Sequence, residues 1–341
     1  MTQSRFHLWL CAAVLLFVGC KRSEPSSEGS AGEPKAPMVS FLLSTLQEER
    51  YKKDQSYFEA TAKAAGLEAS TLSADNDNAR QLAQVEDVLA RGAKVLVIQP
   101  TDSAAAAGYV AKAHAKGAKV VAYDRSIPGA DFYVAHDSFR VGVLQAEQAV
   151  KATGGKGKYV ILAGQSGHSV ATEISRGYHH VLKPYVDKGE IEIVLEKSHD
   201  AWSPEQALKT LEDAIAKTQG NIQAILAHNS GMARGAVQAI QAANLSEKSV
   251  FIAGADADAA NVNYVCEKKQ SVEVLKDIKP LAEKAAQVAA RLAKGEAVEA
   301  PDKIDGVPVV AVPVVLVTPE NVKTTLIESG FHQASAVAAC N

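Results

Sequence analysis

The chain has 341 residues, of which 47% are hydrophobic and 22% are charged, and its formal net charge is −3. This length is enough for about two domains with substantial cores. The small net charge, with no stripe of basic residues, argues against a nucleic-acid partner.

The first twenty residues are predicted to be a lipoprotein signal peptide. Arg5 precedes an apolar run over 8–19 that is too short to span a membrane. The run ends in Val18-Gly19-Cys20, which is similar to the site at which lipoproteins are cleaved and lipidated, although Phe17 departs from the usual leucine. Residues 21–36, rich in Ser, Glu, Gly and Pro, are predicted to form a flexible tether. We therefore expect an exported protein anchored to a membrane surface through a lipid on Cys20, with ordinary signal cleavage as the alternative.

Four cysteines occur in the chain, and two of them fall in the signal segment, as Cys11 and Cys20. The other two, Cys266 and Cys340, are free to pair in an oxidising compartment, but their spacing alone leaves the pairing open. No Cys-x-x-Cys motif or His/Cys cluster indicates a metal site. We expect neither a metal nor a cofactor.

From residue 38 onward, apolar runs alternate with segments of helical periodicity. Strands are predicted at 39–44, 68–72, 95–99, 120–123 and 132–135, with helices at 50–65, 79–91 and 104–116. The pattern then repeats, with strands at 159–162, 191–195, 224–227, 250–253 and 272–275 and helices at 172–188, 204–217, 232–243 and 257–268. A long helix at 278–294, two apolar segments at 307–312 and 314–317, and a last helix from Pro319 or Glu320 follow. This alternation predicts two α/β units in tandem, each with a parallel sheet.

Polar residues follow several of these strands directly. In open α/β sheets, ligands bind beyond the carboxyl ends of the strands. The candidate residues at these ends are Arg50, Asp124, Arg125, Asn229, Asp256 and Lys276, with Trp202 in the loop before Pro204. Helix capping is the alternative role for Asn229 and Asp256, and packing is the alternative for Trp202. If two units face each other across a cleft, this mixture of acids, bases and aromatic rings suits a polyol, whose hydroxyls both donate and accept hydrogen bonds.

At these residues the chain resembles the type I periplasmic sugar-binding proteins of ABC importers, and within them the D-xylose-binding branch. The resemblance covers about residues 38–333. It is carried by Glu49-Arg-Tyr-Lys-Lys-Asp54, Val95-Leu-Val-Ile98, Val121-Ala-Tyr-Asp-Arg125, Asp131-Phe-Tyr133, Leu182-Lys-Pro-Tyr-Val186, Trp202-x-Pro-Glu-x-Ala-Leu208 and Gly254-x-Asp-Ala-Asp258.

The resemblance implies two doubly wound parallel-sheet domains joined by a three-strand hinge, which close on one monosaccharide. The N-terminal domain is expected to comprise 37–138 and 278–305, and the C-terminal domain 139–277 and 306–341. Hydrogen bonds to the sugar are expected from Arg50, Asp124, Arg125, Asn229, Asp256 and Lys276. Tyr51, standing where the family has a tryptophan, and Trp202 are expected to sandwich the sugar ring.

One segment departs from the family pattern. Where the family has an Asp and an Asn, this chain has His168 and Val170. His168 can still bond a hydroxyl and is counted among the expected ligand-binding residues, whereas Val170 cannot; Gln165, Ser166 and Ser169 are candidates to replace the lost contact. Losing one hydrogen bond costs about 0.5–1.5 kcal/mol, enough to change selectivity among pentoses and hexoses.

The expected function is therefore a lipid-anchored, monomeric substrate-binding protein, which delivers a monosaccharide to an ABC permease and catalyses no reaction. A sugar sensor of the same fold, presenting its ligand to a membrane receptor or kinase, is the alternative that the sequence leaves open. An enzyme is disfavoured, because Gly154-Gly-Lys-Gly157 precedes a strand and no Gly-x-Ser-x-Gly or Walker sequence occurs. A repressor is disfavoured because a signal segment stands where a DNA-binding domain would.

Overall fold

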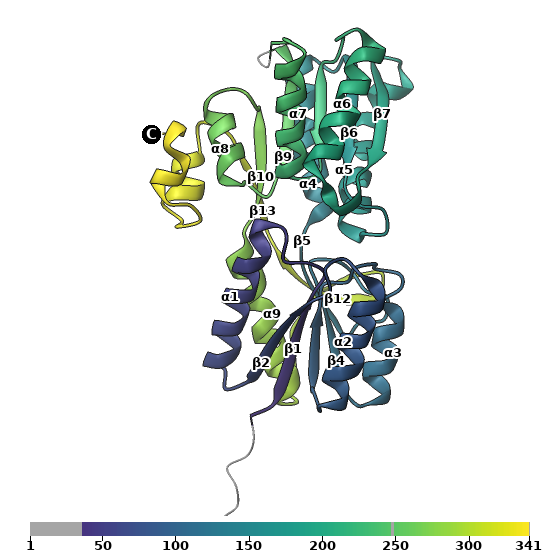
Figure 1. Cartoon of the computed structure of the whole chain (residues 1–341), viewed down its shortest axis with the longest axis vertical. Coiled ribbons are helices and arrows are strands. Elements are labelled where there is room, and N and C mark those ends of the chain that lie inside the picture. Colours follow the sequence, from purple (N-terminus) through teal and green to yellow (C-terminus); the bar gives the residue numbers. More distant parts are fainter. Residues whose placement is uncertain (1–35, 247–248, 341) are drawn as a thin grey trace, which may run out of the picture. The chain divides into compact units, whose positions relative to one another are not determined.

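The computed structural model describes residues 36–246 and 249–340, and they build two separate sheets. The signal peptide, Cys20 and nearly all of the tether lie outside the described residues. The first sheet has the order β11-β12-β5-β4-β3-β1-β2, and the second has the order β13-β10-β9-β8-β6-β7. Figure 1 shows both sheets with their helices.

The first sheet and its helices come from three parts of the chain. Its strands are β1 (Met38–Leu43), β2 (Glu68–Ser73), β3 (Val95–Ile98), β4 (Lys119–Tyr123), β5 (Phe132–His136), β11 (Asp302–Ile304) and β12 (Val307–Val312). Its helices are α1 (Glu49–Ala64), α2 (Asn78–Ala90), α3 (Ala107–Ala115) and α9 (Ile278–Ala293). Because successive strand residues face opposite sides, Phe41 packs with α1 and α9 whereas Leu42 packs with α2 and α3.

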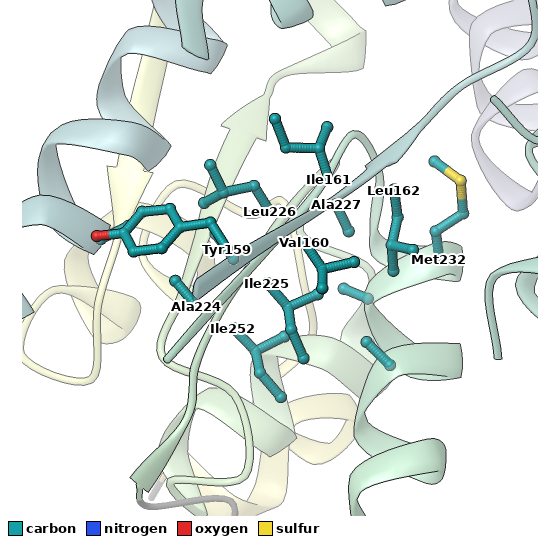
Figure 2. Packing of buried hydrophobic residues seen from close by; sticks show 14 of the residues in the cluster. Tyr159, Val160, Ile161, Leu162, Ala224, Ile225, Leu226, Ala227, Met232 and Ile252 are labelled. Atoms are coloured by element: carbon teal, nitrogen blue, oxygen red, sulfur yellow. The ribbon is translucent and has the colours of Figure 1, made fainter. Parts of the chain in front are cut away.

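The second sheet repeats this plan. Its strands are β6 (Gly157–Ala163), β7 (Ile191–Ser198), β8 (Ala224–Ala227), β9 (Phe251–Ala255), β10 (Val272–Lys276) and β13 (Val314–Val317). Its helices are α4 (Ser138–Thr153), α5 (Ser169–Asp187), α6 (Pro204–Thr218), α7 (Ser230–Ala242) and α8 (Ala259–Cys266), with a 3-10 turn at Asp200–Trp202. Figure 2 shows part of its core, where Val160, Ile225 and Ile252 from three adjacent strands lie together.

The strand orders confirm the predicted doubly wound units. Numbering each unit's first five strands from its own start gives the order 2-1-3-4-5 in both sheets, with all these neighbours parallel. The sheets are not wholly parallel, because β11 and β13 run antiparallel to their neighbours β12 and β10. Three segments connect the two sheets, as the resemblance implied: β5 to α4, β10 to α9, and β12 to β13.

The last connection differs from the expected domain boundary after residue 305. β12 pairs with β5 in the first sheet, and the chain passes to the second sheet only at Pro313, where β13 begins to pair with β10. Both strands are short apolar runs, and the partners that assign them to a sheet, β5 for β12 and β10 for β13, lie far away in the sequence. The local pattern therefore did not reveal that they belong to different sheets.

The predicted last helix is shorter than expected, begins later and is not an α-helix. In its place are a short π-helical turn, Lys323–Ile327, and a 3-10 segment, Ala334–Cys340. The side chain of Asn321 accepts a hydrogen bond from Thr318 N and donates one to Leu316 O, and Gly330 takes a left-handed φ of 78°. Both features break the helical backbone pattern.

The structure answers the question of the two remaining cysteines, because Cys266 and Cys340 form a disulfide. It joins the end of α8 to the last 3-10 segment. No helix among the described residues is both long and apolar enough to cross a membrane.

Candidate ligand-binding site

Most of the predicted site residues line one small, nearly closed cavity of about 10 Å³. The predicted residues in its lining are Arg50, Tyr51, Asp124, Arg125, Trp202, Asp256 and Lys276. Glu48 and Val170 complete the lining. Four larger hollows, of about 600, 570, 450 and 40 Å³, lie elsewhere on the described residues. The small cavity is the candidate site because buried charged side chains converge only there among these five hollows.

Arg50 is the centre of the charged side chains. Its guanidinium lies 3.5 Å from Asp54 Oδ2, 3.5 Å from Asp124 Oδ1 and 3.8 Å from Asp256 Oδ1. Lys276 Nζ lies 2.7 Å from Asp256 Oδ1. Because Asp256 follows β9 in the second sheet whereas Arg50 is in α1, the Arg50–Asp256 pair joins the two α/β units across the cavity.

The two aspartates have opposite pKa shifts. Burial alone would raise the pKa of Asp124, but Arg50, Lys276 and Arg125 together outweigh burial and hold the pKa well below its ordinary value. Burial raises the pKa of Asp256, and Lys276 and Arg50 offset only part of that shift. Despite the nearby Lys276, Asp256 Oδ1 has no hydrogen bond of good geometry among the described residues. It is therefore an acceptor suited to a donor from a ligand.

Three of the lining residues have strained backbones. Asp124, Trp202 and Asp256 have φ values of 61°, 55° and 98°, in the left-handed region that L-residues rarely adopt. Neighbouring groups hold Asp124 in place: Tyr133 Oη donates to its carbonyl at 2.9 Å, and Gln99 Nε2 donates to its Oδ2 at 3.1 Å. Such strain clusters at functional sites, where the surrounding structure fixes a side chain in a working position.

Two aromatic side chains contribute apolar surface to the cavity. The Tyr51 ring lies 5.2 Å from the Arg50 guanidinium, and its hydroxyl accepts a 3.4 Å hydrogen bond from Arg125 Nη2. The Trp202 ring lies against the backbone of Gly164, so closely that a Cβ there would be 2.5 Å from ring atoms. Both rings are buried, and they meet the requirement for flat walls beside a ligand.

His168 does not take the position expected of it, since it is not among the cavity-lining residues. Its Nδ1 accepts a hydrogen bond from Trp202 Nε1 at 2.8 Å, so its proton is on Nε2, which donates to Thr101 O at 2.8 Å. Burial and the nearby Arg125 lower its pKa to about 3, which keeps the ring neutral. In this arrangement His168 orients Trp202 and links the second unit to the first, and its expected contact with a sugar stays a prediction.

Asn229 is also outside the cavity lining. Its Oδ1 accepts from Met232 N at 2.9 Å, which is the helix-capping role that the sequence left open. Val170 does line the cavity, as an apolar wall. Of its suggested substitutes, Gln165 accepts from Ala201 N and Ser169 accepts from Ser126 N, each at 2.8 Å.

The sequence analysis missed three residues of the site. Glu48 lines the cavity just before α1 and is half-buried; burial raises its pKa to about 7, against the opposing charge of Arg125. Gln99 follows β3 and would have been found by the strand-end rule that identified Asp124. Asp54 is buried behind Arg50 and accepts a hydrogen bond from the hydroxyl of Tyr123.

The lining side chains carry equal numbers of acids and bases. The acids are Glu48, Asp124 and Asp256, and the bases are Arg50, Arg125 and Lys276. A free anion would require a net positive lining, whereas paired charges offer both donors and acceptors to a neutral ligand. The arrangement therefore suits a small, neutral, hydroxyl-rich molecule.

Comparison with known proteins agrees with this architecture. Residues 39–297 match the family model described as the periplasmic binding protein domain. The chain is 36% identical to the D-xylose-binding periplasmic protein of Escherichia coli over 312 residues, covering 89% of this chain and 94% of that one. It is 33% identical to the Haemophilus influenzae protein of the same name, over 96% of this chain and 98% of that protein.

A solved structure agrees as well. The carbohydrate transporter solute-binding protein of Chloroflexus aurantiacus, in complex with D-glucose, superimposes with a TM-score of 0.80 at 30% identity, covering 87% of this chain and 97% of that one. Because the family model spans most of the chain and these relatives cover both α/β units, the chain belongs to the periplasmic binding protein family.

Proposed function

We propose that this chain is the substrate-binding protein of an ABC sugar importer, and that it binds one monosaccharide between its two α/β units. The observation that carries the proposal is the small cavity, lined by three acids, three bases and two aromatic rings from both units. The relatives named for D-xylose and the structure holding D-glucose support a pentose or hexose, with D-xylose as the first candidate.

The proposed mechanism is binding without chemistry. Arg50, Asp124, Arg125, Asp256 and Lys276 hydrogen-bond the hydroxyls, and Tyr51 and Trp202 flank the ring. A sugar that contacts both units stabilises the arrangement in which they are close together, and a membrane permease recognises that arrangement. The alternative, a sensor that presents the sugar to a membrane receptor, uses the same site. Genes for a sugar permease and an ATPase beside this gene would favour import.

Calorimetry with a panel of monosaccharides, including D-xylose and D-glucose, tests the proposal. We expect one or more sugars to bind, and sugar at 100 times its Kd to add about 2.7 kcal/mol to the free energy of unfolding. The Asp124→Ala variant should bind about 10- to 100-fold more weakly, because it loses hydrogen bonds to a charged acceptor. The exposed Asp213→Ala variant is the matched control and should bind like the parent. Equal affinity in Asp124→Ala and the parent would show that the site is misplaced.

We further propose that the protein is exported and held at a membrane by a lipid on Cys20, since that residue follows an apolar run and two small residues. Expressed in its own host, the parent should fractionate with membranes and carry the mass of a lipid on its first residue. Cys20→Ala should abolish the lipid mass and release the protein into the soluble fraction. A parent chain that is cleaved elsewhere and carries no lipid would contradict the anchor.

A further inference from the structure

Asp256 reaches the cavity from a strained turn that is held from two sides. The turn consists of Asp256 and Ala257, with φ values of 98° and 56°. On one side, Ala257 N donates to Glu273 Oε2 at 3.1 Å. On the other side, His332 Nε2 donates to Ala257 O at 2.7 Å. Both supporting side chains are buried.

His332 comes from a C-terminal segment, residues 318–340, that lies outside both sheets. Two hydrogen bonds attach this segment to α8: Asn263 Nδ2 donates to Ala336 O at 2.9 Å, and Ala339 N donates to Asn263 Oδ1 at 3.0 Å. The Cys266–Cys340 disulfide fixes its end. Its apolar side chains share one buried cluster with Ala257, formed also by Val262, Leu275, Val317, Val322, Leu326 and Val337.

Two consecutive non-glycine residues in the left-handed region are unfavourable unless their surroundings hold them. The strand β9 fixes the chain before the turn, since Asp256 N donates to Val274 O at 2.9 Å. After the turn, the hydrogen bond from His332 is the contact that fixes the Ala257 carbonyl. The N–H of the same peptide, Asp258 N, donates to Ser230 Oγ at the longer distance of 3.2 Å. Without the hydrogen bond from His332, the peptide keeps only this longer hydrogen bond and can rotate toward a relaxed conformation, and that rotation displaces the Asp256 carboxylate from Lys276 and Arg50.

We propose that His332 is a positioning residue for ligand binding: the cross-linked C-terminal segment brings it to the turn, and its hydrogen bond keeps Asp256 aimed into the cavity. The inference rests on the proposed function, in which Asp256 accepts hydrogen bonds from a sugar. His332 itself does not line the cavity.

The test compares three variants of the full chain by calorimetry with D-xylose and D-glucose. His332→Ala should raise Kd about three- to tenfold, because it removes one hydrogen bond that holds the turn. His332→Gln keeps an N–H donor at the same distance along the side chain and should restore Kd to within about twofold of the parent. Asn263→Ala loosens the same segment at a distance from the turn, so it should lower Tm while leaving Kd unchanged.

A second measurement separates this inference from the proposed function. Hydrogen exchange at the Ala257 and Asp258 amides of the sugar-free protein should be faster in His332→Ala than in the parent, and not in Asn263→Ala. If the parent binds neither sugar, the proposed ligand is wrong and the exchange rates alone decide whether His332 holds the turn. Unchanged exchange in His332→Ala, unchanged Kd in His332→Ala, or an equal loss of affinity in Asn263→Ala would each overturn the inference.

Discussion

Glu48 shows how a single residue changes the character of the site. It stands one residue before α1 and supplies the third acid of the cavity, which brings acids and bases into balance. Its pKa, raised by burial to about 7, means that its charge changes within the physiological range. The cavity is therefore neutral above pH 7 and gains positive charge below it.

We predict that sugar binding takes up a proton at Glu48. The side chain keeps some contact with water in the free protein, and a bound sugar removes that water, so the pKa rises further in the complex. A group whose pKa is higher in the complex than in the free protein favours binding at low pH. The affinity for the sugar should therefore fall as the pH rises through 7, by at most about tenfold per pH unit. Calorimetry in buffers of different ionisation enthalpy measures the uptake. Glu48→Gln should show none; proton release by the parent would contradict the prediction.

At this scale, the sequence was sufficient for residues whose position follows from one local rule. Asp124, Arg125, Asp256 and Lys276 end strands, and the structure places them all on the cavity. His168 could not be assigned in this way, because its role depends on Trp202 and Thr101, which are far from it in the sequence. Whether a side chain faces a ligand or a neighbouring carbonyl is decided by such distant partners.

At the scale of elements, the position of Trp202 in the turn after β7 depends on the residue at the end of β6. Trp202 sits in a 3-10 turn whose Ala201 also has a left-handed φ, of 52°. Its ring can lie over the end of β6 only because Gly164 has no side chain. The His168 ring, at the N-cap of α5, then accepts the indole N–H. The position of the Trp202 ring therefore depends on three elements: its own 3-10 turn, the end of β6 at Gly164 and the start of α5 at His168.

Gly164→Ala should displace the indole, because the added Cβ would lie 2.5 Å from ring atoms that cannot bend away. We expect sugar affinity to fall about tenfold, comparable to the loss of one strong contact, and the tryptophan emission to shift. A chain beginning at residue 36 has Trp202 as its sole tryptophan, so the emission reports this ring directly. Gly108→Ala, in α3 with nothing within 4 Å of the new Cβ, is the control. Unchanged emission and Kd in Gly164→Ala would contradict the account.

Element types could be predicted from periodicity, but several ends could not. α8 begins at Ala259, two residues later than predicted, because Asp256 and Ala257 are held in left-handed conformations. α5 begins at Ser169, three residues earlier than predicted, after the left-handed Gly167. The first residue of each of these helices is determined by the groups that surround the preceding turn. The hydrophobic periodicity of the local sequence does not reveal those groups.

At the scale of the whole molecule, the two units share one strand order. The internal repeat in the sequence predicted two tandem α/β units with parallel sheets, but not that order. The repeat explains why the polar strand ends of both units form one site: each unit presents the carboxyl edge of its sheet. The connections between units were harder to predict. β12 and β13 are adjacent in sequence and similar in composition, yet each joins a different sheet.

This crossing also sets where motion between the units concentrates. Only Pro313 separates Val312, paired with His136, from Val314, paired with Lys276, and the proline ring fixes its own φ near −65°. Any rotation of one sheet against the other therefore has to bend this crossing, which offers very few torsion angles beside Lys276, together with the two other connections. The strand β7 lies four positions from β10, about 19 Å at the usual strand spacing. In such a rotation Lys276, close to the crossing, would move little. Trp202, which follows β7 far from the crossing, would be displaced farther.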